Sequence, residues 1–234
     1  MIVTASPPGI RAAQGATRTI PIVTILQLQF MMGFVESLAR PGGNVTGIAF
    51  QDNELSEKRL DLFRQAVPRL SKIAILWNGA EGGDPRSVQM IEDAAKRMAL
   101  QVLRVEVREP KDFAEAIAKA KSWGAQGLVE MASPFITKNR KLLLDLLESN
   151  RLPATCEMRL YVAEGCLMTY SGNLDAMFRR EAYFVDRILK GASPKDLAVE
   201  QPREFEFVIN LKAAKALGLT IPQSVLVRAD EVIQ

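Results

Sequence analysis

The chain has 234 residues, of which 48% are apolar and 24% charged, and its net charge is only +3. These values suit a globular protein of one large or two small domains, and they give no argument for binding to nucleic acid or an anionic membrane. The sequence contains no histidine, which excludes Ser-His-Asp and Cys-His catalytic sets and removes the commonest metal ligand. We therefore expect no metal centre and no cofactor.

Two cysteines, Cys156 and Cys166, are present. Two cysteines cannot build a Cys-rich zinc site or a disulfide framework. A single bridge between them is the alternative, but we expect two free thiols that act as small apolar residues.

The N-terminal residues 1–5 (MIVTA) are predicted to form a buried strand. They lack a basic segment followed by an apolar core and a cleavage site, so we expect no signal peptide in this chain. The most apolar window, residues 20–35, is interrupted by Gln27 and Gln29. It is shorter than the roughly 20 residues that a membrane-spanning helix needs, and we predict a strand, a loop and a helix there.

Short apolar runs alternate with amphipathic segments along the chain. Nearly continuous apolar runs are typical of parallel strands that are covered on both faces. We predict strands at residues 1–5, 20–26, 45–50, 72–77, 101–107, 127–132, 152–156 and 166–171.

The segments between these runs have helical spacing. Asp84 followed by Pro85 marks one helix start, and Asp112 marks another. The last long helix is predicted at about residues 174–190. Its predicted buried residues are Phe178, Ala182, Val185 and Leu189.

Alternating strands and helices indicate an α/β fold with parallel sheets and right-handed crossovers. Residues 72–170 form a complete alternating set, whereas the first 50 residues supply only three strands. We therefore expect two cores, the first completed by the C-terminal part, in a chain that crosses between two lobes more than once.

Polar and aromatic residues follow several of the predicted strands. Ligands of open α/β sheets bind at the carboxyl ends of strands, and such a set suits a small polar ligand with an apolar side. The alternative is that each residue is a cap or a turn residue. The candidate ligand-binding residues are Ser6, Gln27, Gln29, Asn78, Asp84, Ser133, Phe135, Glu157, Tyr170 and Asn173.

The sequence has no Gly-rich nucleotide-binding motif, and RPGGN at residues 40–44 precedes a strand, so we interpret it as a turn. Without a histidine or a nucleophile elbow, an enzyme would depend on carboxylates, Lys or Tyr, with Glu157 and Asp84 as candidate acids. We identify no catalytic residue.

Three segments carry a resemblance to a known family. They are residues 37–47 (SLARPGGNVTG), residues 55–78 (LSEKRLDLFRQAVPRLSKIAILWN) and residues 184–233, which contain VEQP, FVINLKAAKALGLTIP and RADEVI in order. The chain resembles the substrate-binding proteins of bacterial ABC uptake transporters that have a type I periplasmic-binding fold, specifically the tyrosine/tryptophan-binding-like group.

The resemblance implies two α/β lobes, each a parallel sheet flanked by helices, with a hinge and a ligand in the cleft between them. We place the first lobe at residues 1–53 and 174–234 and the second at residues 54–173. It also implies a periplasmic protein that passes a small molecule, such as an aromatic amino acid or related carboxylate, to a membrane permease. Backbone amides at helix starts near Asp84 and Thr137 would receive a carboxylate.

Two features depart from the family's pattern. Members begin with a signal peptide and two further strand-helix units, so we expect an N-terminally truncated first lobe with a bare strand edge. Either the chain is shortened or a neighbouring copy, in a homodimer, covers the edge. Members also carry Gly-Asp-Pro where this chain has Gln27-Leu28-Gln29, which removes a charge that could hold an amino group.

Two other functions remain open at this point. Ligand-responsive repressors share the architecture, so the chain could be a ligand-sensing regulatory domain. A carboxylate-based α/β enzyme is the other alternative.

Overall fold

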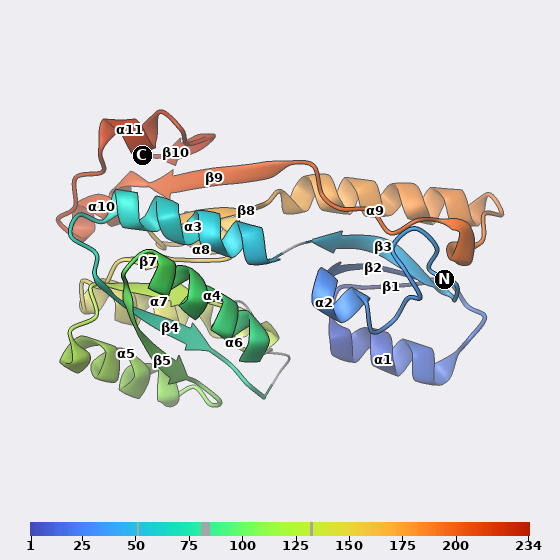
Figure 1. The fold of residues 1–234 in the computed structure, drawn as a ribbon, viewed down its shortest axis with the longest axis horizontal. Coiled ribbons are helices and arrows are strands. Elements are labelled where there is room, and N and C mark those ends of the chain that lie inside the picture. The colour runs from blue at the N-terminus through green and yellow to red at the C-terminus, as the bar shows by residue number, and fades with distance from the viewer. Residues whose placement is uncertain (51, 81–84, 132) are drawn as a thin grey trace. The chain divides into compact units, whose positions relative to one another are not determined.

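The computed structural model describes residues 1–50, 52–80, 85–131 and 133–234, with the backbone alone described at residues 29 and 52–54 (Figure 1). Asp84, a predicted ligand-binding residue, lies outside the described residues. Contacts between residues divide the chain into two compact units. Unit 1 comprises residues 1–52 and 172–205, and unit 2 comprises residues 53–171 and 206–234.

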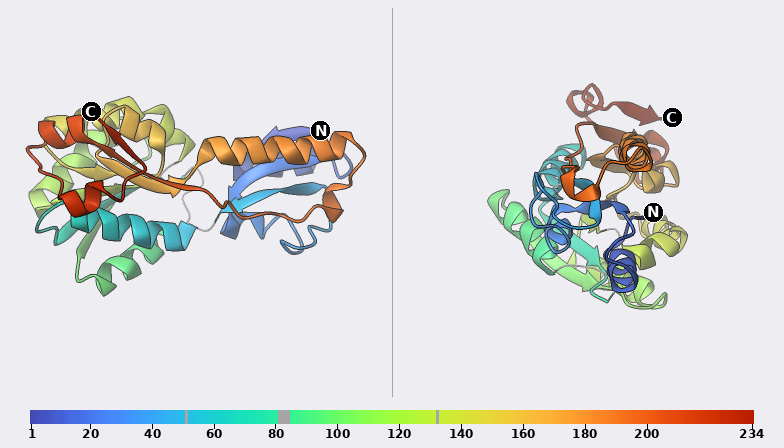
Figure 2. Two further views of the ribbon diagram at one scale, coloured as in Figure 1. Left: turned by 90° about the horizontal axis from the view of Figure 1, so that it is seen from above. Right: turned by 90° about the vertical axis from the view of Figure 1, so that its right-hand side faces the viewer.

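Unit 1 is built on a parallel sheet of three strands in the order β1-β2-β3. Helices α1 and α9 cover opposite faces of this sheet (Figures 1 and 2). Its elements are β1 (Ile2–Thr4), α1 (Pro7–Ala16), β2 (Ile22–Gln27), α2 (Leu28–Met31), β3 (Val45–Phe50), α9 (Leu174–Leu189) and a 3-10 helix (Pro194–Asp196).

Helix α9 packs on the sheet with a different face from the predicted one. Its buried residues are Met177, Glu181 and Phe184, whereas Phe178 is 49% and Leu189 73% exposed. The two stripes are both largely apolar and both have helical spacing, so periodicity alone does not choose between them. The prediction that Phe178, Ala182 and Leu189 are buried is therefore wrong, whereas Val185 is half-buried and packs against the same core as Met177 and Phe184.

Unit 2 is built on a sheet of seven strands in the order β10-β9-β8-β7-β6-β4-β5. Strands β4 to β8 run parallel to one another. The elements are α3 (Asp52–Ala66), β4 (Lys72–Trp77), α4 (Pro85–Arg97), β5 (Gln101–Glu106), α5 (Asp112–Trp123), β6 (Gly127–Glu130), α6 (Pro134–Lys138), α7 (Arg140–Ser149), β7 (Ala154–Thr155), α8 (Arg159–Ala163), β8 (Met168–Gly172), β9 (Phe205–Asn210), α10 (Leu211–Ala216), α11 (Gln223–Leu226) and β10 (Glu231–Ile233).

Strand β9 runs antiparallel to β8. The N–H of Asn210 bonds to Leu167 O, and the N–H of Asn173 bonds to Glu204 O, so residue numbers rise along one strand as they fall along the other. Strand β10 is parallel to β9. The sheet is therefore mostly parallel, as predicted, with two reversed strands at one edge.

The C-terminal residues 206–234 belong to unit 2, although we placed them in the first lobe. Phe207, Ile209 and Val225 lie in the same core cluster as residues of α3 and β4, and β9 hydrogen-bonds to β8. The predicted boundary is corrected because sheet pairing and core packing both tie this segment to unit 2.

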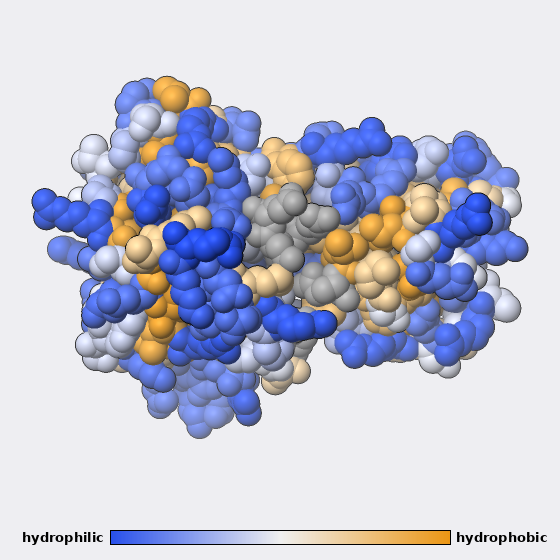
Figure 3. Space-filling model, in the orientation of Figure 1, coloured by the Kyte–Doolittle hydropathy of each residue, from blue (hydrophilic) through white to orange (hydrophobic). Residues whose placement is uncertain are grey.

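All eight predicted strands are present, with ends that differ by a few residues. Strands β9 and β10 were not predicted. No helix in the described part of the chain is long and apolar enough to cross a membrane. Most of the surface visible in Figure 3 is hydrophilic, with apolar side chains in smaller patches.

Gly47 holds β3 close to β2. It lies opposite Thr24 in the register and has a φ of +140°, a conformation that side chains other than glycine rarely adopt. A Cβ atom at this position would overlap the backbone carbonyl of Thr24.

We expect Gly47→Ala to destabilise unit 1 by about 3 kcal/mol or more, because both the backbone conformation and the neighbouring strand oppose the added methyl group. Gly43→Ala is the matched control, since no atom lies within 4 Å of its added Cβ. Thermal unfolding followed by circular dichroism should show a lower Tm for Gly47→Ala alone. Equal Tm values for the two variants would contradict this account.

Candidate functional site

The carboxyl ends of parallel strands β4, β6 and β7 lie along one edge of the unit 2 sheet. Glu130 is the last residue of β6, and Glu157 lies two residues beyond the end of β7. Ligands of open α/β sheets bind at such an edge. Glu130 and Glu157, with Arg59 of α3, form a group that we call the carboxylate cluster.

Arg59 connects α3 to the end of β7. Its Nη2 donates to Oε1 of Glu157 and to Oγ of Ser56, both at 3.3 Å. The Arg59 side chain is only 3% exposed and that of Glu157 11% exposed. The Nε of Arg59 is buried without a hydrogen-bond partner among the described residues.

Glu130 lies beneath this ion pair and is fully buried. Its Oε2 accepts a hydrogen bond from the backbone N–H of Glu157 at 3.1 Å. Burial raises the pKa of Glu130 to about 7, against the lowering effects of that N–H, of the Arg59 charge and of the Tyr161 hydroxyl. The guanidinium therefore pairs with Glu157 and acts on Glu130 through its charge, while burial keeps Glu130 partly protonated near neutral pH.

Tyr161 of α8 packs beside the cluster. Its hydroxyl donates to Oγ1 of Thr137 at 3.0 Å. Burial, and then the charge of Glu130, raise the pKa of Tyr161 far above its ordinary value, so it stays a neutral phenol. Thr137 lies inside α6 and its N–H bonds to Ser133 O, so the prediction that it offers a helix-start amide is wrong.

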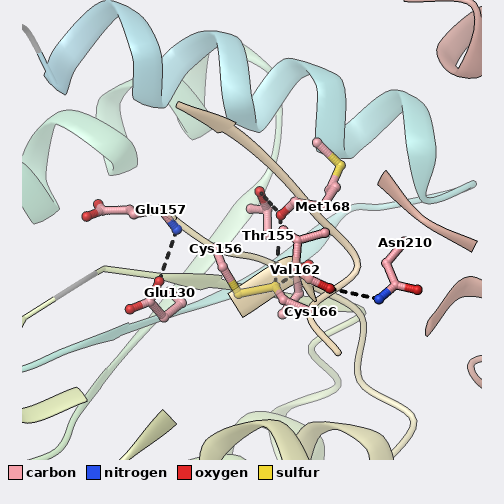
Figure 4. Close-up of a disulfide and its surroundings, with 9 residues drawn as sticks. Glu130, Thr155, Cys156, Glu157, Val162, Cys166, Met168 and Asn210 are labelled. Atoms are coloured by element: carbon pink, nitrogen blue, oxygen red, sulfur yellow. Dashed lines mark hydrogen bonds between the residues drawn. A yellow bond between two sulfur atoms is a disulfide. The ribbon is translucent and has the colours of Figure 1, made fainter. Parts of the chain in front are cut away.

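Cys156 and Cys166 form a disulfide, contrary to the prediction of free thiols (Figure 4). Their Cα atoms are 6.5 Å apart because the segment between them, which contains α8, returns the chain to the neighbouring strand. The bridge therefore closes the segment that carries Glu157 and Tyr161. Figure 4 shows the Glu157 side chain pointing away from the disulfide, while the backbone N–H of Glu157 donates a hydrogen bond to Glu130.

Asn78 and Ser133 hold backbone turns at the same sheet edge. Asn78 is 2% exposed, donates to Val107 O at 2.8 Å and accepts from the N–H of Ala80. Ser133 caps α6 by accepting from the N–H of Ile136. These contacts support the cap-and-turn alternative for both residues.

The two predicted aromatic contacts are packed against the cores of unit 2. Phe135 stacks on Phe113 with ring centres 5.7 Å apart. Tyr170 meets Phe207 edge-on at 6.5 Å. Both residues are half-buried.

The candidates in unit 1 also serve as caps or strand ends. Ser6 caps α1, and Asn173 caps α9 by accepting from the N–H of Ala176 at 2.9 Å. Gln27 ends β2 and is half-buried, and Gln29 lies in α2. Neither cap residue belongs to the carboxylate cluster.

A pocket of about 400 Å³ lies within unit 1 between α9 and residues 200–204. Arg180 crosses it, with a bidentate ion pair to Glu200 at 2.6 and 2.7 Å and its guanidinium 3.8 Å from the centre of the Tyr183 ring. Within the pocket, Arg180 is therefore already paired with Glu200 and stacked on Tyr183.

Sequence reasoning identified Glu157 but missed Arg59, Glu130 and Tyr161. Glu130 is the only charged residue in the apolar run GLVEMA. Arg59 lies on the helix face defined by Leu60 and Phe63, where an apolar residue is expected. Both Arg59 and Glu130 are charged residues at positions where the pattern predicts the core, and this feature could have identified them from the sequence.

Among the described residues no group of three or more potential ligands is arranged to hold a metal ion. A model of ABC transporter substrate-binding proteins matches residues 1–233. The chain belongs to the ABC transporter substrate-binding protein family. Other members of this family are substrate-binding proteins rather than enzymes.

The chain is 26% identical to a tyrosine-binding protein of Clostridioides difficile over 94% of its own length, and it spans 63% of that relative's length. Two crystal structures share the fold. One is the ABC domain of Streptococcus pneumoniae in complex with L-Trp, at a TM-score of 0.90 and 24% identity over 100% of this chain and 78% of the other. The other is a conserved domain protein of Vibrio cholerae, with a TM-score of 0.89 and 23% sequence identity. That match covers 98% of this chain and 77% of the other.

We expect Glu130→Gln to change the pH dependence of stability in this substrate-binding family member. The folded-state pKa of Glu130 is raised, so its stabilising contribution is full at pH values below the unfolded pKa and is lost as pH rises through about 7. The free energy of unfolding of the variant should exceed that of the wild type by about 2–3 kcal/mol above pH 7, and the two should differ little near pH 4.5. Glu148→Gln, at an exposed residue, is the control, and parallel Tm curves from pH 4.5 to 8.5 for all three proteins would refute the assignment.

We expect loss of the disulfide in a Cys156→Ala, Cys166→Ala double variant to cost about 2–3 kcal/mol, because the bridge closes a short loop in the unfolded chain. Tm with and without a reducing agent measures this effect, and mass spectrometry confirms reduction. A wild-type Tm that is unchanged after complete reduction would show that the bridge does not stabilise unit 2.

Proposed function

We propose that the protein is the solute-binding component of an ABC uptake transporter and holds a small molecule without changing it. The observation that carries this proposal is the family match over residues 1–233. The carboxylate cluster supports a binding role for unit 2, because it places charged groups at the sheet edge where open α/β sheets receive ligands.

An aromatic amino acid or a related carboxylate is the proposed ligand. A tyrosine-binding relative and a neighbour crystallised with L-Trp support this class. Phe135 and Tyr170, two half-buried aromatic residues of unit 2, suit such a ligand. Asn78 and Ser133 would act by fixing the backbone around the ligand.

The proposed partner is the membrane permease of the same transporter, outside the cytoplasm. The Cys156–Cys166 disulfide supports this location, since disulfides persist in oxidising compartments. Strand β1 forms one end of the unit 1 sheet, and Val3 on it is 53% exposed. This edge supports the proposal that a second copy of the chain pairs there.

One observation favours a carboxylate-based enzyme as the second candidate. A buried carboxyl group with a pKa of about 7, next to a second carboxyl group, is what general acid catalysis requires. The two functions can be distinguished by recovering the ligand after incubation with the protein and testing whether it has been chemically changed. A binding protein returns it chemically unchanged after prolonged incubation, as mass spectrometry would show.

We expect L-tryptophan or L-tyrosine to raise the Tm of the protein, since a ligand that binds only the folded state stabilises it. A ligand at 100 times its Kd adds about 2.7 kcal/mol. Thermal shift against a panel of amino acids, amines, carboxylates and sugars, with titration calorimetry of each positive solute, measures this. If no solute in the panel binds, the proposed function is wrong.

A further inference from the structure

We propose that the pocket between α9 and residues 200–204 binds a small organic anion of single charge, a carboxylate with an apolar body. All the residues that line this pocket belong to unit 1, so the site is separate from the carboxylate cluster. The inference goes beyond the proposed function and is tested separately from it. It follows from the rigidity of the pocket walls, from the charges that the lining leaves uncompensated and from the apolar part of the lining.

Hydrogen bonds within unit 1 hold both walls of the pocket in place. The N–H of Ala49 donates to Glu200 O at 2.8 Å, and the N–H of Glu200 donates to Gly47 O at 3.0 Å, so this wall is fixed to β3. The N–H of Asn173, the N-cap of α9, donates to Glu204 O at 3.0 Å. A volume of about 400 Å³ between such walls lies within the range of small-molecule sites.

Arg180 forms one charged side of the pocket and is already neutralised. Its guanidinium makes a bidentate pair with Glu200 at 2.6 and 2.7 Å and lies 3.8 Å from the centre of the Tyr183 ring. The hydrogen bonds of this pair raise the pKa of Arg180 and lower the pKa of Glu200, so both groups stay charged around neutral pH. The two charges cancel, and neither needs a ligand.

Two further arginines bring positive charge that is not cancelled in this way. Arg179 and Arg203 line the pocket, and within the described part of the chain neither makes a hydrogen bond or an ion pair. The remaining described carboxylate of the lining is that of Glu204. With the Arg180–Glu200 pair neutral, two positive charges and one negative charge leave a net charge of +1. A ligand with one negative charge compensates this excess, whereas a cation increases it.

The rest of the lining is largely apolar. Ile48 of β3 and Met177 of α9 are buried, and Ala176 and Pro202 are half-buried. An aliphatic or aromatic body removes this surface from water, which a bare inorganic anion does not do. Since guanidinium groups bind carboxylates through paired N–H donors, the charged end of the ligand belongs beside the two unpaired arginines.

Fluorine NMR of protein labelled with 3-fluorotyrosine locates the binding. The chain has three tyrosines, and only Tyr183 lies in unit 1, where it lines the pocket. The variant Tyr183→Phe assigns its signal. Phenylacetate should shift the Tyr183 signal saturably, with a Kd of about 1 mM or lower. No saturable change of this signal up to about 20 mM would overturn the proposal, and so would a change confined to Tyr161 and Tyr170 of unit 2.

Three compounds separate the contribution of the charge from that of the apolar body. Phenylacetate has both, phenylacetamide has the body alone, and acetate has the charge alone. We expect phenylacetate to bind at least about tenfold more tightly than either of the others. Equal affinity for phenylacetamide would show that the pocket does not recognise the charge, and equal affinity for acetate would show that the apolar lining is not used. Either result overturns the proposal.

Arginine variants identify the groups that receive the carboxylate. Arg179→Gln and Arg203→Gln should each weaken the binding of phenylacetate at least about fivefold, because each removes a charged donor. The double variant should bind phenylacetate no more tightly than the wild type binds phenylacetamide. Arg187→Gln is the matched control, since Arg187 is exposed on the same helix and does not line the pocket. Full affinity in the double variant, with an unchanged Tm, would refute the assignment.

The double variant also keeps this inference apart from the proposed function. A panel solute that raises its Tm as much as that of the wild type binds outside the pocket and supports the transport function alone. A solute whose effect is lost in the double variant binds in the pocket and gives no support to that function. A saturable, charge-dependent response of Tyr183 supports the pocket even if every other solute of the panel fails to bind.

Discussion

The arrangement at the edge of unit 2 depends on the burial of one guanidinium together with two carboxyl groups. Removing Arg59, Glu130 and Glu157 from water is costly, and the cost is offset only if each charge finds a partner. Arg59 pairs with Glu157, and the N–H of Glu157 binds Glu130. Because each contact spans different elements, the positions of α3, β6 and the end of β7 are coupled.

The surrounding covalent and polar contacts keep this edge in one conformation. Strand β7 has only two residues, so few backbone hydrogen bonds connect it to the neighbouring strands. The Cys156–Cys166 bridge ties that end to the start of β8, and the Tyr161 hydroxyl bonds to Thr137 of α6. At the start of α8, Arg159 pairs with Glu206 and Glu231, which connects the same segment to β9 and β10.

The parallel strands were predictable because nearly continuous apolar runs such as residues 72–77 have few other interpretations. Strand β9 was missed because Phe205–Asn210 has Glu206 within it and is surrounded by charged residues, although Glu206 is buried and paired. The face of α9 was wrongly predicted because Phe178 and Leu189 are as apolar as the residues that pack on the sheet. Packing, rather than periodicity, decides such a case.

The site was predictable only in part for a similar reason. The rule that ligands bind at strand ends found Glu157, but it says nothing about α3, which contributes Arg59 from almost one hundred residues earlier in the chain. The cysteine prediction failed because ten residues of separation do not fix a Cα–Cα distance, and the fold between them does. Long-range pairing is the information that a single sequence lacks.

The charge cluster has an energetic consequence that bears on function. A buried carboxyl group whose pKa is raised to about 7 destabilises the folded state at neutral pH, so packing alone does not explain its place at the end of β6. Groups that cost stability are typical of functional sites, where a ligand compensates them. Unit 1 has a comparable group in Glu181, which is 5% exposed on the face of α9 that packs against the sheet. The position of Glu130 at a strand end, where open α/β sheets receive ligands, supports the binding role that we propose for the carboxylate cluster.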